Sequence, residues 1–237
     1  MLKLNLTRLA LAVTFLLASF AAVPAQSTIF NVPSTNVEGP GRVYVEGDFI
    51  MHYASYRDGG FQTYGPRVVV GLPGKTEVGV NVFYTRAETS QPIKVQPNFK
   101  WQFYENESLG LKFAAGVVIS TPITHRRLAS TYALVYALGS KSFPGSFGPK
   151  VTFGGYRLVG SFAEGTDKTG VIIGLEQPVT SKISFVTDWS SGKNDYGYVI
   201  AGTGITLSPK STFFAGYNFG NHGRGNNSLA AFYSYEF

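Results

Sequence analysis

The chain closes with Tyr233-Ser234-Tyr235-Glu236-Phe237, which has an aromatic residue at every second position. Successive side chains of a β-strand point to opposite faces, so the three aromatic residues would share one face and Ser234 and Glu236 the other. A strand with one apolar and one polar face is typical of a barrel wall between lipid and a polar interior. This ending therefore predicts an all-β chain, and it sets which residues face outward.

The same alternation recurs from Arg42 onward, in segments separated by clusters of Gly, Pro, Asn, Asp or Ser. The segments are about 9–13 residues long, and a tilted strand needs about 9–11 residues to cross a bilayer. We predict a closed antiparallel up-and-down transmembrane β-barrel of about 12 strands, with 10–14 possible. The predicted strands are residues 42–53, 62–72, 76–86, 93–105, 109–120, 131–141, 149–160, 169–178, 182–191, 196–207, 211–220 and 228–237.

The first 25 residues have the layout of a signal peptide. Lys3 and Arg8 precede an apolar run at residues 9–23, and small residues up to Ala25 suit a cleavage site, so we expect the mature chain to begin at Gln26. A membrane anchor is less favoured, because the run is shorter than the ~20 residues of a spanning helix.

Two further regions follow the predicted signal peptide. Residues 26–41 are polar and rich in proline, and we expect them either to hang in the periplasm or to enter the barrel as a plug. Residues 42–237 would form the barrel itself.

Composition excludes several classes of protein. Charged residues make up only 14% of the chain and aromatic residues 15%, whereas soluble domains carry nearer a quarter charged residues. The absence of cysteine excludes disulfides and thiol chemistry. The net charge of +6 contains no basic run longer than Arg126-Arg127, so we expect no nucleic-acid partner. No motif predicts a cofactor.

The leader, the strand alternation and the aromatic ending together resemble those of bacterial outer-membrane β-barrel proteins, with a small porin-like barrel of about twelve strands. The resemblance implies an outer-membrane location, reached through a cleaved signal peptide, and contact with lipid and lipopolysaccharide. It also implies that Tyr233, Tyr235 and Phe237 form the signal read by the barrel-assembly machinery. It names no solute and no oligomeric state. The soluble alternative is a secreted β-sandwich.

The face opposite Phe237 places charged and amide side chains in the lumen. We predict a basic arc on the second to seventh strands, an acidic arc on the remaining strands, and a group of polar amides on the fourth strand. The basic arc is Arg67, Lys94, Lys100, Lys112 and Arg157; the acidic arc is Glu46, Asp48, Glu176, Asp188 and Glu236; the polar group is Gln96, Asn98 and Gln102. Opposed arcs would set up a transverse field across the lumen. The alternative is that these side chains meet in the middle and fill it.

Three expectations depend on the hairpin geometry. Arg157 reaches the lumen only if Gly154-Gly155 forms a bulge, which we expect because a charge on lipid at mid-depth costs ~2–4 kcal/mol. Folding the first hairpin puts Asp48 opposite Arg67 as an ion pair. Closure of the last strand on the first brings Glu236 near Arg42.

A twelve-stranded barrel has room for a bore on the order of 10 Å after inward side chains are subtracted. Inward glycines such as Gly174 and Gly216 would leave space. We therefore predict a narrow passive channel for small polar or charged solutes. A filled barrel with a structural or surface-interaction role is the alternative.

An outer-membrane lipid-modifying enzyme is less favoured. His52, His125 and His222 are the only histidines, and the His-x-Ser pattern of outer-membrane phospholipases is absent. His52 and His222 would be neighbours at the outer mouth, but no third ligand is evident for a metal.

Overall fold

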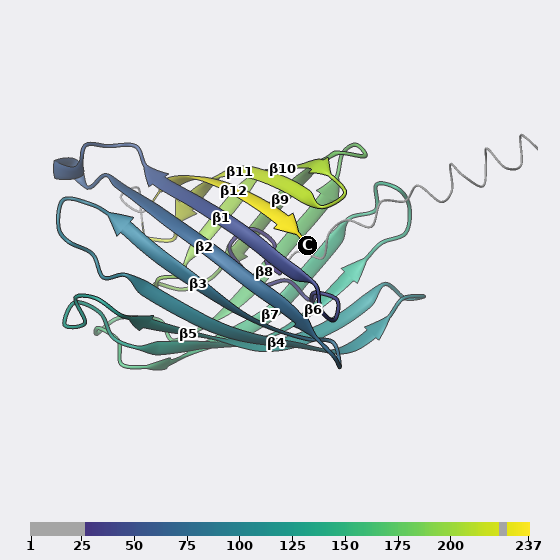
Figure 1. Cartoon of the computed structure of the whole chain (residues 1–237), viewed down its shortest axis with the longest axis horizontal. Coiled ribbons are helices and arrows are strands. Elements are labelled where there is room, and N and C mark those ends of the chain that lie inside the picture. Colours follow the sequence, from purple (N-terminus) through teal and green to yellow (C-terminus); the bar gives the residue numbers. More distant parts are fainter. Residues whose placement is uncertain (1–26, 223–226) are drawn as a thin grey trace, which may run out of the picture.

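Twelve strands form one closed antiparallel barrel in the computed structural model, which describes residues 27–222 and 227–237 (Figure 1). The predicted fold and strand number are confirmed. The strands are β1 (Val43–His52), β2 (Phe61–Leu72), β3 (Thr76–Arg86), β4 (Lys94–Asn106), β5 (Leu111–Pro122), β6 (Tyr132–Ser142), β7 (Lys150–Gly160), β8 (Thr169–Pro178), β9 (Ile183–Ser190), β10 (Tyr198–Ser208), β11 (Ser211–Gly220) and β12 (Ser228–Glu236). The predicted signal peptide, residues 1–25, lies outside the described residues.

Each strand pairs with its neighbours in sequence, and β12 closes the barrel by pairing with β1. A single turn of 3-10 helix, η1 (Tyr56–Asp58), lies between β1 and β2. Within the described part of the chain, no helix is long and apolar enough to span a membrane.

The two ends of the barrel differ in their connections. At one end, tight turns such as the one between β2 and β3 use Gly74 and Lys75, both with positive φ. We call this the turn end, and it also holds the start of β1 and the end of β12. The opposite end carries the more polar connections, including the one that contains η1, and we call it the loop end.

The face assignment from Phe237 holds for β12. Leu229, Tyr233 and Phe237 are exposed on the outer surface, whereas Phe232 and Glu236 are buried in the interior. Large apolar side chains are exposed on the same outer face of the other strands, as on the lipid-facing surface of a membrane barrel.

Arg157 lies on the outer face, so its prediction as a lumen residue is wrong. The pairing of β7 with β6 runs from Lys150 to Gly160 without a register shift, and the pairing with β8 is also continuous through Gly154 and Gly155. Without a bulge, Arg157 keeps the outward parity and is exposed. It lies close to the loop end of β7, where a long side chain can reach the interface and avoid the mid-membrane penalty.

A bulge occurs instead in β4. The register between β4 and β5 shifts between Trp101 and Tyr104, which reverses the parity of the last residues of β4. Glu105 therefore pairs with Lys112 on the interior side, a contact that simple alternation did not predict.

Residues 27–38 lie inside the ring of strands. In Figure 1 this segment is the purple trace enclosed by the barrel, and Ile29 and Phe30 are 0% exposed. Of the two arrangements expected for residues 26–41, the described residues adopt the interior one.

Candidate functional site: the barrel interior

Residues 27–38, which we call the N-terminal segment, bind one wall of the lumen through Asp188 of β9. The Oδ2 atom of Asp188 accepts hydrogen bonds from three consecutive backbone amides: Phe30 N at 2.8 Å, Asn31 N at 2.9 Å and Val32 N at 3.3 Å. Successive N–H groups that converge on one anion form a nest, which suits a carboxylate. Asp188, placed in the acidic arc by sequence, therefore pairs with the backbone of the segment.

Aromatic rings and glycines of the same wall receive the side chains of the segment. The Phe30 ring packs edge-on against Phe214 and Phe232, with centroid separations of 5.5 Å in both cases. A Cβ at Gly216 would lie 3.0 Å from Phe30 Cζ, and one at Gly174 would lie 2.3 Å from Ile29 Cδ1. The space left by these inward glycines is therefore occupied by the segment, whereas the sequence suggested an open bore.

A second set of contacts joins the segment to the opposite wall, toward the turn end. Lys100 of β4 forms an ion pair with Glu77 of β3 at 2.9 Å and donates to the backbone oxygen of Ser27 at 2.8 Å. Glu77 also accepts from the Ser27 hydroxyl at 2.6 Å. The hydroxyls of Thr35 and Ser140, on β6, are hydrogen-bonded at 2.6 Å.

Arg67 of β2 is the centre of a buried ion cluster in the wall. Its Nη2 lies 2.6 Å from Asp48 Oδ2, and its Nε lies 3.4 Å from Glu46 Oε1. Tyr44 donates to the other Glu46 oxygen at 2.5 Å. The expected Asp48–Arg67 pair is thus confirmed, but the residue directly opposite Arg67 is Glu46, because the hairpin is centred one residue earlier than expected.

Other predicted lumen charges also lie in ion pairs. Glu236 pairs with Arg42, as expected from closure of the barrel. Three further predicted charges pair with partners that the sequence did not predict: Lys112 with Glu105 at 3.0 Å, Lys94 with Asp195 at 3.3 Å and Glu176 with Lys150 at 2.8 Å. The basic and acidic arcs are consequently interrupted by counter-charges, which shortens the range of any transverse field. The partners of Lys112 and Glu176 are on neighbouring strands, whereas Asp195, the partner of Lys94, is in the connection between β9 and β10.

The predicted polar group lines the wall next to Arg67. Gln96 accepts a hydrogen bond from Asn81 at 3.3 Å, and Asn98 donates to Asn81 at 3.4 Å. Gln102 is buried nearer the turn end. Gln96 and Asn98 thus share hydrogen bonds with Asn81 and present a neutral polar surface, whereas the amide nitrogen of Gln102 has no partner among the described residues.

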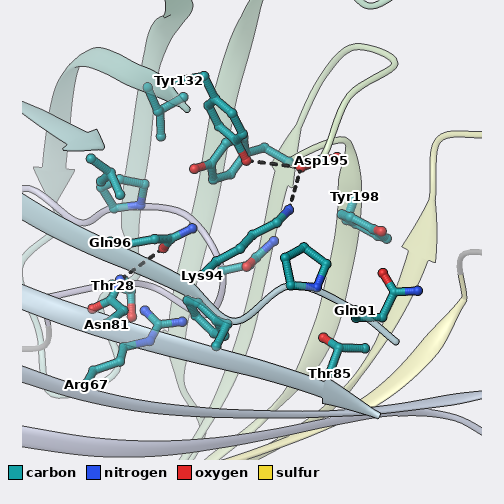
Figure 2. A pocket seen from close by; sticks show the side chains of 17 residues that line it. Thr28, Arg67, Asn81, Thr85, Gln91, Lys94, Gln96, Tyr132, Asp195 and Tyr198 are labelled. Carbon is teal, nitrogen blue, oxygen red and sulfur yellow. Dashed lines mark hydrogen bonds and ion pairs between the residues drawn. The ribbon is translucent and has the colours of Figure 1, made fainter. Parts of the chain in front are cut away.

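Cavities remain on the side of the lumen that the segment leaves free (Figure 2). The cavity drawn there has a volume of about 330 Å³, and its lining includes Thr28 of the segment, Arg67, Asn81 and Gln96. A smaller cavity of about 40 Å³ shares Thr28, Arg67 and Asn81 with it and extends to Glu77. The wall of β2 to β5 is therefore partly accessible, whereas the segment covers the wall of β8 to β12 around Asp188, Gly174 and Gly216.

The loop end opens onto these cavities. A third cavity of about 440 Å³ shares Lys94, Tyr132 and Asp195 with the 330 Å³ cavity. Asp195 accepts from the Tyr132 hydroxyl at 3.0 Å as well as pairing with Lys94. Figure 2 shows the side chains of Lys94 and Tyr132 pointing toward Asp195.

Glu38 is a buried acid of the segment without a hydrogen-bond partner for either carboxylate oxygen within the described residues. Burial, together with the nearby carboxylates of Glu236 and Glu77, raises the pKa of Glu38 to about 8 from its usual value of 4.5. Burial therefore favours the protonated form of this carboxyl.

The contacts of His52 are those of a packed side chain at the loop end of β1. His52 Nδ1 is hydrogen-bonded to the backbone oxygen of Asn227, and its ring stacks on Phe61 at a centroid separation of 6.0 Å. Within residues 27–222 and 227–237, no group of three His, Cys, Asp or Glu side chains could hold a metal ion.

No protein-family model matches the sequence, and no curated protein matches it. Solved structures do match the fold. A KdgM porin superposes with a TM-score of 0.60 at 6% identity, over 82% of this chain and 99% of the porin. A KdgM porin in complex with disordered oligogalacturonate gives 0.57 at 6% identity, over 83% and 99%. The chain thus has the closed β-barrel fold that these porins share.

Proposed function

We propose that the protein is a narrow passive channel of the bacterial outer membrane for small polar or charged solutes. The cavity of about 330 Å³ at the loop end carries this proposal, because amide, hydroxyl and charged side chains line it inside a closed barrel with an apolar outer face. Solute sites are commonly concave and orient their ligands with a few polar groups. A KdgM porin has been solved with oligogalacturonate, a polar solute, which agrees with this class.

Export and assembly follow from the two ends of the chain in this proposal. The leader would be cleaved after Ala25, and Tyr233, Tyr235 and Phe237 would direct the last strand to the barrel-assembly machinery. Lipid and lipopolysaccharide would surround the apolar outer face. We assign no catalytic activity, no cofactor and no nucleic-acid partner.

A filled barrel with a structural or surface-interaction role is the second candidate. It is favoured by the burial of Ile29, Phe30 and Val32 in the lumen. Closely packed apolar side chains exclude water, so a segment that never leaves the wall would make the barrel impermeable.

Protein refolded from Gln26 onward and inserted into planar bilayers is expected to give discrete current steps. A variant that lacks residues 27–38 serves as the open reference, and its steps should be larger and longer-lived. A silent full chain beside a conducting deletion variant would favour the filled barrel. Silence of both proteins would refute the channel.

We further infer that the paired charges at the loop end affect ion selectivity. Replacing Lys94 with Gln leaves Asp195 without its cation at the mouth. The unpaired Asp195 carboxylate attracts a cation by up to about 1 kcal/mol at a separation of about 4 Å in water. The ratio of cation to anion permeability should therefore rise by at most about fivefold. Reversal potentials across a KCl gradient measure this shift. Arg157→Gln is the matched control, because Arg157 lies on the outer face, and an equal shift in that variant would contradict the assignment.

A further inference from the structure

The wall formed by β8 to β12 is shaped as a receptor for an extended peptide. Its polar anchor is the Asp188 carboxylate, which binds three successive amides of the segment. Its apolar part is the recess where Phe30 lies between Phe214 and Phe232 and over Gly216. Backbone amides and one aromatic side chain are therefore recognised together, as in other peptide-binding sites.

The segment is held by side-chain contacts and not by the barrel ladder. None of the twelve strands includes residues 27–38, and the one β-bridge described outside the strands joins Thr28 to Pro33 within the segment itself. Removing the segment from the wall would leave every strand pairing of the barrel intact. The segment can therefore separate without unfolding the wall.

Two features of the docked state favour release. The Glu38 carboxyl is buried without a hydrogen-bond partner among the described residues, and such burial is energetically costly. The cavities of about 330 and 40 Å³ lie directly beside Thr28 and Pro33, so the segment has free volume on the side opposite Asp188.

We propose that this wall is a binding site for residues 27–38 and that the channel opens when the segment leaves it. The inference rests on the proposed channel function and adds its regulation. In the docked state the contacts of Ser27 with Lys100 and Glu77, and of Thr35 with Ser140, place the segment across the lumen toward the turn end. In the released state the Asp188 carboxylate and the apolar recess over Gly216 become part of the wall of a wider bore.

A reversible disulfide lock tests the proposal on the full chain. The hydroxyl oxygens of Thr35 and Ser140 are 2.6 Å apart, and a disulfide bond is about 2.05 Å long, so Thr35→Cys with Ser140→Cys places two sulfur atoms within bonding reach. The chain has no cysteine of its own, so no competing disulfide can form. Oxidation should reduce the open time in planar bilayers at least about tenfold, and dithiothreitol should restore it. Each single cysteine variant is a control and should not respond to dithiothreitol.

A second variant tests the site through its ligand. Phe30→Ala leaves the barrel wall unchanged but empties the recess, and it should raise the open time at least about tenfold. A synthetic peptide of residues 27–38 with the native Phe30 should then block the Phe30→Ala channel saturably. The same peptide with Phe30→Ala is the matched control and should block far less.

The outcomes separate this inference from the proposed function. If the reduced lock variant conducts and oxidation changes nothing, the segment is not a gate, although the channel stands. Unaltered open time in Phe30→Ala, together with no block by the native peptide, would also overturn the binding site. If the wild-type chain and the reduced variant are both silent, the channel function itself fails.

Discussion

Replacing Arg67 with Met is expected to lower the free energy of unfolding by about 3–5 kcal/mol. Arg67 is 7% exposed, and the carboxylates that it neutralises belong to Glu46 and Asp48, which are 1% and 4% exposed. Without the guanidinium, two buried carboxylates would lie side by side on the same face of β1. Like charges in a medium of low dielectric repel strongly, and neither carboxylate could recover its hydration. Urea unfolding of the refolded protein in detergent micelles, followed by tryptophan fluorescence, measures the change.

The control for this prediction removes the charges together. Arg67→Met combined with Glu46→Gln and Asp48→Asn should recover most of the lost stability, because replacement of a whole buried ion cluster by neutral groups is often nearly neutral. A loss below about 1 kcal/mol in the single variant would show that water reaches the cluster and screens it. A triple variant as unstable as the single one would instead assign the loss to the packing of Arg67 against Phe83 and Phe232.

The strands and their faces could be predicted because a barrel wall imposes a strict two-residue period. The ending at Tyr233, Tyr235 and Phe237 identified the outer face, and β12 has this parity in the structure. Most predicted strand boundaries lie within two residues of the observed ones, since Gly, Pro, Asn and Asp at the connections interrupt the pattern.

The errors concern backbone register, where one bulge was missed, another was wrongly expected and one hairpin was displaced. The bulge between Trp101 and Tyr104 brings Glu105 inside, and no residue in that stretch marks it in the sequence. Gly154-Gly155 permits a bulge but forms none, so Arg157 stays outside. A one-residue displacement of the first hairpin put Glu46 opposite Arg67. Register is a cooperative property of paired strands, so single-strand patterns determine parity better than they determine partners.

The position of the N-terminal segment could not be predicted from its own residues. Residues 27–38 have neither the two-residue period of a strand nor the 3.6-residue period of a helix, so no face could be assigned. Its binding site is formed by residues far away in sequence, such as Asp188 and Gly216. From the sequence, Asp188 was expected to be a lumen charge, and Gly216 was expected to leave empty space. The same glycines that would widen a bore also form a recess for Phe30.

Replacing Asp188 with Ala is expected to increase the ratio of open to closed time about 30-fold or more. The carboxylate accepts three backbone amides of the segment, and the net contribution of one hydrogen bond to a charged group is about 1.5–3 kcal/mol. Partial rehydration of the freed amides reduces the total, so we take about 2 kcal/mol, which corresponds to about 30-fold. Single-channel recording in planar bilayers measures the ratio directly.

The matched controls separate loss of the anchor from loss of a lumen charge. Asp188→Asn keeps one carbonyl oxygen as an acceptor and should give a smaller increase. Glu176 is on the adjacent strand β8, and its carboxylate pairs with Lys150. Glu176→Gln should therefore leave the ratio of open to closed time nearly unchanged. A triple variant that combines Asp188→Ala with Thr35→Cys and Ser140→Cys should have a high open time when reduced and a low open time when oxidised. If the oxidised triple variant still conducts, Asp188 limits conduction by some route other than holding the segment on the wall.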